Sequence, residues 1–273
     1  MEFIENPDSA DFFLLGLPID QGTENQGCSE APSQIRKGFD NIFLSENGNI
    51  RGVYDHSDVV EEDKFEDTMD KIFNKTRELL KARKPMIFLG GNHSVTIPIV
   101  QAYSRHFDKI GVVFIDAHPD CQPGYYPYGD VIGSLNSIDE VTELMLVGIR
   151  NWSRNEYQFL IENRIPFITM QDIFEKKMDY ILDRIKEQMS DVDAIYISLD
   201  IDAIDPAFAP ATGWIEPGGL SSRQTLQLIK ELAKLKKVAG LDIVEVNPAK
   251  DVNNMTSILS AKIISEFIGS YKK

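Results

Sequence analysis

The sequence predicts an α/β protein in which a mainly parallel, doubly wound sheet carries helices on its faces. Short apolar runs rich in Val, Ile, Leu and Phe recur along the chain and mostly do not alternate with polar residues, which is typical of strands buried on both faces. Amphipathic helical segments lie between these runs, as βαβ units require. The 273 residues contain no repeat and no Ser/Gly-rich linker, so we expect one domain over residues 1–273.

The strands are expected at apolar runs of four to seven residues. In chain order these runs are Phe12–Leu17, Met86–Leu89, Gly111–Ile115, Leu144–Gly148, Phe167–Met170, Ala194–Leu199 and Val238–Val244. The helices are expected where charged residues occupy one face and Ile, Leu or other apolar residues the other. These segments are Thr68–Arg83, Ser94–His106, Asp179–Met189, Ser221–Leu235 and Thr256–Ile268.

The chain is strongly acidic, with 43 Asp and Glu against 28 Lys and Arg and a formal net charge of −15. Nucleic acids and anionic membranes both require clustered Lys and Arg, so we expect neither as a partner. Most of the acidity is expected to serve solubility, although a cationic substrate or a bound cation also suits it. The sequence shows no secretory signal, no run of 18 apolar residues and only two cysteines, which favours the cytoplasm.

Four of the expected strands end in residues that carry chemistry. Ligands of open α/β sheets bind beyond the carboxyl ends of the strands, so we expect these side chains to share one site. They are His93 after the run 86–89, Asp116, His118 and Asp120 after 111–115, Asp200 and Asp202 after 194–199, and Glu245 after 238–244.

The spacing of these residues indicates a metal site. Residues i and i+2 of an extended chain point the same way, so Asp116, His118 and Asp120 can face one point. Four carboxylates packed together would repel one another, and a divalent cation relieves that repulsion. Oxygen-rich sites with imidazole suit Mn²⁺ or another borderline divalent cation. A single ion with six ligands is one alternative. Two ions that share bridging carboxylates suit four Asp and two His better and would support two-metal hydrolysis.

Each cluster alone has a plainer interpretation. An Asp-x-Asp after a strand is usually a turn or a helix cap, and His93 alone could be a hydrogen-bonded core histidine. Their joint occurrence at the ends of three strands favours metal binding.

Three blocks resemble the ureohydrolase family of arginases, agmatinases, guanidino-acid hydrolases and formimidoylglutamases. They are Leu-Gly-Gly-Asn-His-Ser at 89–94, Val-Val-Phe-Ile-Asp-Ala-His-Pro-Asp at 112–120 and Ser-Leu-Asp-Ile-Asp at 198–202. Residues 16–20 and 242–248 also resemble the first-strand and last-strand motifs of that family. The resemblance covers most of the chain and implies a three-layer, arginase-like α/β/α fold, a trimer or hexamer, and two Mn²⁺ per subunit.

The same resemblance implies a role for each site residue. A hydroxide between the two ions attacks the guanidinium carbon and releases urea and an amine. A carboxylate is a strong, directional partner for a planar guanidinium. The implied roles are one ion on His93 and Asp120, the other on His118 and Asp202, bridges from Asp116 and Asp200, and the substrate guanidinium on Glu245.

The chain departs from the family pattern in the loop after Asp120. Family members usually carry a His-Gly there, and that histidine is the proposed proton shuttle. Residues 125–131 read Tyr-Tyr-Pro-Tyr-Gly-Asp-Val instead. Asp130 or Tyr128 could take the shuttle position, and Asp130 is the better general acid if its pKa is raised. Asn92 replaces an Asp often found before the first histidine, and we expect it to orient His93 by a hydrogen bond.

The substrate is expected to be agmatine, with putrescine and urea as products. The residues that recognise arginine in arginases are not visible after Asp120 or after Gly148-Ile149-Arg150, and the latter segment looks more like agmatinases. Arg150 and Arg154 could instead hold a carboxylate, so a guanidino-acid hydrolase, a formimidoylglutamate hydrolase or an arginase are alternatives. The missing loop histidine raises one more alternative, a catalytically weak homologue that binds metal and a guanidine for structural or regulatory purposes.

Overall fold

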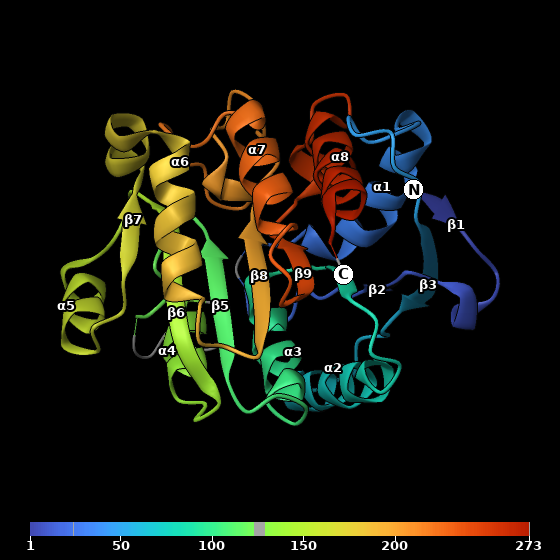
Figure 1. Cartoon of the computed structure of the whole chain (residues 1–273), viewed down its shortest axis with the longest axis horizontal. Helices are drawn as coiled ribbons and strands as arrows, with labels where there is room; N and C mark the ends of the chain where they lie inside the picture. Colours follow the sequence, from blue (N-terminus) through green and yellow to red (C-terminus); the bar gives the residue numbers. More distant parts are fainter. Residues whose placement is uncertain (24, 123–128, 273) are drawn as a thin grey trace.

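A single sheet of nine parallel strands forms the centre of the computed structural model, which describes residues 1–23, 25–122 and 129–272 (Figure 1). The strand order is β1-β3-β2-β4-β9-β8-β5-β6-β7, and every neighbouring pair is parallel. The strands are β1 (Glu2–Phe3), β2 (Phe12–Gly16), β3 (Gly52–Asp58), β4 (Met86–Leu89), β5 (Ile110–Ile115), β6 (Val141–Ile149), β7 (Phe167–Thr169), β8 (Ala194–Asp200) and β9 (Val238–Val244).

Helices cover both faces of the sheet, which confirms the predicted three-layer α/β/α architecture (Figure 1). One layer contains α1 (Ala31–Gly38), α6 (Met170–Gln188), α7 (Ser222–Leu232) and α8 (Met255–Ser270). The other contains α2 (Phe65–Leu80), α3 (Thr96–Tyr103), α4 (Val131–Asn136) and α5 (Arg154–Glu162). None of the helices in the described part of the chain combines the length and the apolar character needed to cross a membrane.

The continuous apolar runs exist because each central strand buries both of its faces. In β4, Ile87 and Leu89 belong to the hydrophobic cluster on one side of the sheet, and Met86 and Phe88 belong to the cluster on the other. Successive side chains of a strand point to opposite faces, so a strand covered on both sides has no position for a polar alternation. The predicted strands are therefore confirmed, with shifts of a few residues at their ends.

The elements that the sequence did not predict lie mainly at the edges of the sheet or in short segments. Strand β3 has the sequence Gly-Val-Tyr-Asp-His-Ser-Asp and is only partly buried, so no apolar run marks it. Strand β1 has two residues, and α1, α4 and α5 have six to nine. Helix α6 begins nine residues before the predicted Asp179, with a kink at Lys177, whose φ is 64°.

The sheet order brings the chemically active strand ends together. Strands β4, β9, β8 and β5 are consecutive neighbours in the sheet, although β8 and β9 come much later in the sequence. Because these strands are parallel, the residues that follow them emerge at one edge. His93, Glu245, Asp200 and Asp116 therefore leave the sheet side by side.

Candidate metal centre

The turn that presents His93 depends on two glycines and an asparagine cap. A Cβ on Gly91 would lie 2.0 Å from the carbonyl oxygen of Ile19, so only glycine permits this close approach. The Asn92 Oδ1 accepts a hydrogen bond from the Ser94 N–H at 3.1 Å, and its Nδ2 donates to the Gln21 carbonyl at 2.8 Å. Asn92 thus fixes the turn, and the predicted hydrogen bond from Asn92 to the His93 imidazole is absent from the described residues.

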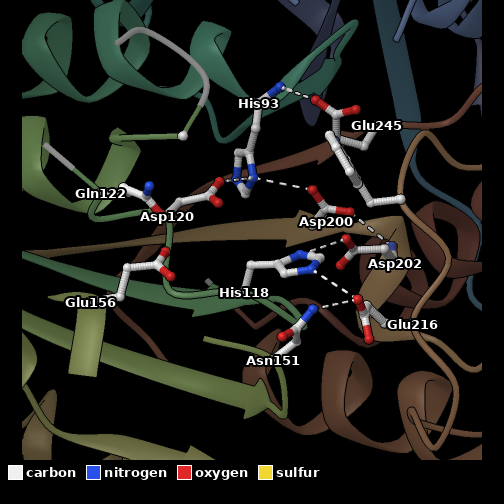
Figure 2. Close-up of a pocket in the computed structure, with 12 residues that line it drawn as sticks. His93, His118, Asp120, Gln122, Asn151, Glu156, Asp200, Asp202, Glu216 and Glu245 are labelled. Atoms are coloured by element: carbon white, nitrogen blue, oxygen red, sulfur yellow. Dashed lines mark hydrogen bonds and ion pairs between the residues drawn. The ribbon is translucent and has the colours of Figure 1, made fainter. Parts of the chain in front are cut away.

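The His93 imidazole faces three carboxylates. Its Nδ1 lies 3.2 Å from Asp116 Oδ2, 3.3 Å from Asp120 Oδ2 and 3.2 Å from Asp200 Oδ2. His93, Asp116 and Asp200 are almost completely buried. The three carboxylates reach His93 from the ends of β5 and β8, as the i, i+2 spacing predicted. Figure 2 shows two of them, Asp120 and Asp200, facing the imidazole.

A second imidazole lies on the other side of Asp116. His118 Nδ1 is 3.0 Å from Asp202 Oδ2 and 3.6 Å from Asp116 Oδ1. Asp116 therefore faces both histidines, and it also accepts a hydrogen bond from the His118 N–H at 2.6 Å. The structure brings all six predicted metal ligands into one cluster, shared between His93 and His118.

The cluster fits two divalent cations. His93 Nδ1 and Asp116 Oδ2 are buried and make no hydrogen bond with any residue that the structure describes, so both are available as ligand atoms. Ligand atoms converge in two groups that share Asp116: His93 with Asp116 and Asp120, and His118 with Asp116 and Asp202. A six-coordinate cation with ligands at about 2.1 Å places neighbouring ligand atoms about 3 Å apart, close to the observed 3.0–3.3 Å.

The protonation of the cluster shows the repulsion that cations would relieve. Burial, together with the charges of Asp202 and Asp120, raises the pKa of Asp116 to about 6. Burial and the neighbouring carboxylates raise the pKa of Asp200 well above its ordinary value. Burial lowers the pKa of His118, but its contacts with Asp116 and Asp202 outweigh that effect and raise the pKa to about 12. Without cations, bound protons on these carboxylates and imidazoles therefore compensate the negative charge of the cluster.

A buried network of hydroxyls and one carboxylate contacts the Nε2 side of the His93 imidazole, away from the cluster. His93 Nε2 lies 2.9 Å from Ser198 Oγ, which donates to Asp242 Oδ1 at 2.8 Å. Thr96 Oγ1 and Tyr196 OH both donate to Asp242 Oδ2 at 2.8 Å. With its Nε2 bonded to Ser198, the ring presents Nδ1 to the cluster, as a metal-binding histidine requires.

This network predicts a stability defect. Asp242→Ala leaves the hydroxyls of Thr96, Tyr196 and Ser198 without their common acceptor in the core. Each such buried hydroxyl costs about 1–3 kcal/mol, so we expect the free energy of unfolding to fall by about 3–5 kcal/mol. Urea denaturation of metal-free protein measures this. Asp242→Asn keeps one acceptor oxygen and should lose less, whereas a loss below about 1 kcal/mol in Asp242→Ala would contradict the network's role.

Glu245 lies beside His93 in a strained backbone conformation. Its φ is 61°, and Asp120 likewise has a φ of 45°, a region that costs non-glycine residues energy. Glu245 Oε1 accepts the His93 N–H at 2.8 Å, and Oε2 accepts the Cys28 thiol at 3.7 Å. Burial raises the pKa of Glu245 to about 7. The surrounding structure therefore holds both carboxylates in place despite this cost.

A cavity of about 250 Å³ opens over the cluster (Figure 2). Its described lining contains six carboxylates and two imidazoles but no Lys or Arg. The lining residues are His93, His118, Asp120, Gln122, Gly129, Asn151, Glu156, Asp200, Asp202, Trp214, Glu216 and Glu245.

The other predicted residues lie around this cavity. Asp130 precedes α4 as its N-cap residue, and its neighbour Gly129 lines the cavity while Asp130 does not. Burial and the charge of Asp120 raise the pKa of Asp130. Tyr128, the other shuttle candidate, lies outside the described residues. The exposed Arg154 begins α5 and does not line the cavity.

Arg150 has a structural role. Its Nη2 donates to the carbonyl oxygens of Asp202 and Glu216, both at 2.6 Å, and its Nε donates to the Pro217 carbonyl at 3.2 Å. The guanidinium is thus committed to backbone oxygens and holds the loop after β8 against the sheet. It is not free to bind a substrate carboxylate.

Several contributors to the site were missed in the sequence. Ser198 and Asp242 are polar residues inside apolar runs, and Ser198 lies two positions before Asp200, so the i, i+2 rule could have placed it on the same side. Cys28 begins a short 3-10 helix, and Asn151 and Glu216 lie in loops; all three come from segments distant in sequence and carry no comparable signal.

Comparison with known proteins agrees with this geometry. Residues 10–269 match the model of the Arginase family. The chain is 29% identical to an agmatinase of Sodalis glossinidius, over 98% of this chain and 89% of that protein. The agmatine ureohydrolase of Thermoplasma volcanium superposes with a TM-score of 0.86 at 30% identity, covering 98% of this chain and 92% of the other. The formimidoylglutamase of Bacillus subtilis superposes with a TM-score of 0.91 at 26% identity, covering 98% and 89%. The chain belongs to the arginase family.

Proposed function

We propose that the protein hydrolyses a guanidino C–N bond and that its preferred substrate is agmatine, which water converts to urea and putrescine. The observation that carries this proposal is the cavity over the two-histidine, four-aspartate cluster, lined by carboxylates and by no Lys or Arg among the described residues. Family membership supports hydrolysis of a guanidino group, and the agmatinases among the relatives support this substrate.

The six clustered side chains are the proposed holders of two Mn²⁺. His93 and Asp120 would bind one ion, His118 and Asp202 the other, and Asp116 and Asp200 would bind both. Mn²⁺ is favoured because carboxylate oxygens outnumber imidazole nitrogens. When bound, two such cations lower the pKa of water and so supply the nucleophile near neutral pH.

Glu245 is proposed to orient the substrate guanidinium. Its carboxylate lines the cavity next to His93, and a guanidinium pairs well with carboxylate oxygens. This pairing would hold the guanidinium carbon over the cluster. The departing amine needs a proton, and Asp130, next to the cavity-lining Gly129, is the proposed donor.

The charge of the cavity favours agmatine over substrates that carry a carboxylate. Arg150 is committed to backbone carbonyls, Arg154 lies outside the cavity, and residues 123–128 contain no Lys or Arg in their sequence. Arginine, guanidino acids and formimidoylglutamate would each bring an anion among six carboxylates without a cation to meet it. Agmatine instead brings two positive charges.

Urea release from a substrate panel tests the proposal. The Mn²⁺-loaded protein is assayed with agmatine, arginine, 4-guanidinobutyrate and 3-guanidinopropionate. Arginine differs from agmatine only by its α-carboxylate, so it is the matched comparison. We expect kcat/KM for agmatine to exceed that for arginine by at least about 100-fold. A preference for a carboxylate-bearing substrate would overturn the choice of agmatine, and no turnover of any compound by metal-loaded protein would favour the inactive homologue.

A further inference from the structure

Glu216 presents one carboxylate oxygen that no described residue uses. Its Oε1 accepts a hydrogen bond from Asn151 Nδ2 at 2.5 Å and lies 3.5 Å from His118 Nε2. No hydrogen bond from a described residue reaches Oε2. The side chain lines the cavity and is 23% exposed, so this oxygen is accessible to a ligand (Figure 2).

The loop that carries Glu216 is held firmly. Arg150 donates hydrogen bonds to the carbonyl oxygens of Glu216 and Pro217. The N–H groups of Gly218 and Gly219 both donate to Asp205 Oδ2, at 2.7 and 3.2 Å. A carboxylate on so restrained a loop loses little conformational freedom when it binds a partner.

Trp214, two residues before Glu216 in the same loop, adds an aromatic side chain to the lining of the cavity. Its side chain lines the cavity and is 53% exposed, so a ligand can reach it. An alkylammonium beside an indole gains both apolar contact and cation–π attraction. Glu216 and Trp214 thus offer a negative and an aromatic partner two residues apart.

Glu156, another glutamate in the lining of the cavity, already has a structural task. Its Oε2 accepts the Ser153 N–H at 2.7 Å and closes the capping box that begins α5. Glu156 is also nearly buried. Glu216 is therefore the better placed of the two to meet a ligand that enters the cavity.

We infer that Glu216, which Asn151 orients and which lines the cavity together with Trp214, binds the distal ammonium of the substrate. It would thereby select guanidines with an ammonium at the far end over those whose far end is neutral or carries a carboxylate. Glu245 contacts His93 and Glu216 lies beside His118, so a substrate with a cation at each end would meet a carboxylate at each of the two histidines (Figure 2). This inference rests on the proposed function, because it assigns the guanidinium end to Glu245.

The test compares agmatine with butylguanidine, which has the same chain without the distal ammonium. In Mn²⁺-loaded Glu216→Gln, we expect kcat/KM for agmatine to fall by about 10–100-fold, mainly through KM, because a hydrogen bond to a charged group is lost. Activity on butylguanidine should change less than about threefold. Glu216→Lys should instead favour 4-guanidinobutyrate over agmatine. Glu162→Gln removes the same charge at an exposed position at the end of α5. It should change neither the preference for agmatine over butylguanidine nor that over 4-guanidinobutyrate.

Three results would overturn the inference. Equal losses on both substrates, with loss of bound Mn²⁺, would show that Glu216 only positions His118. A collapse of the agmatine preference in Glu156→Gln but not in Glu216→Gln would place recognition on Glu156. Unchanged kinetics in a Glu216→Gln protein with an unaltered melting curve would exclude the site.

A second readout separates this inference from the proposed function. If no guanidino compound is hydrolysed, the proposed function fails, and calorimetry can then measure the binding of unreacted agmatine and butylguanidine directly. Tighter binding of agmatine that Glu216→Gln abolishes would still support the ammonium site. Equal binding of the two ligands by the unmodified protein would overturn it.

Discussion

Asp116→Asn is expected to lose at least about 1,000-fold in kcat/KM for agmatine and most of its bound Mn²⁺, because cations supply several kcal/mol of catalysis and this residue is proposed to bind both. Asp116 is the one carboxylate common to both groups of converging ligand atoms. The amide of Asn keeps the shape of the side chain but removes its charge and one acceptor oxygen. Metal analysis of the dialysed protein, alongside urea release, measures both losses.

A matched substitution separates this effect from a general change of charge. Asp108→Asn removes the same charge at an exposed position away from the cavity and should leave metal content and turnover unchanged. Full Mn²⁺ content and full activity in Asp116→Asn would refute the bridging role.

Glu245→Gln is expected to lower kcat/KM for agmatine by about 100-fold or more while leaving the Mn²⁺ content intact, because charge-assisted hydrogen bonds to the guanidinium are lost. Gln keeps a carbonyl oxygen that can still accept the His93 N–H now bound by Oε1. The loss should therefore reflect substrate binding and orientation, and the metal ligand His93 should keep its position. Steady-state kinetics with metal analysis test this.

Cys28 provides the control for Glu245. Cys28→Ala removes the thiol that contacts Glu245 Oε2 but leaves its carboxylate in place, so turnover should change far less than in Glu245→Gln. Normal activity in Glu245→Gln would contradict the assignment of the guanidinium to this residue.

The central strands and their chemistry could be predicted because both follow local rules. Strands buried on two faces read as unbroken apolar runs, and the residues that end β4, β5, β8 and β9 are of the metal-ligand type. The order of these strands could not be predicted, since β9 pairs with β4 through contacts far apart in sequence. Strand β3 was not predicted for the opposite reason: it lies next to the short edge strand β1, is only partly buried, and its polar sequence leaves no apolar signal.

The finer parts of the site depend on tertiary contacts. Asn92 was expected to orient His93. Instead, the side-chain Oδ1 of Asn92 accepts the Ser94 N–H and caps the turn, and Ser198 from β8 contacts the imidazole. Arg150 was a candidate for a substrate carboxylate, and only the structure shows its guanidinium surrounded by backbone oxygens. Glu216 has no motif of its own near the predicted ligands, so its closeness to His118 emerges only when the loop after β8 folds back.

The most direct test of a two-cation guanidino hydrolase is a titration of metal-free protein with Mn²⁺ in which urea release from agmatine is measured against the number of ions bound. The two groups of ligand atoms that share Asp116 predict that activity is absent without metal and saturates at two bound ions per chain. Full urea release from the metal-free protein, or no release with two ions bound, would contradict the account.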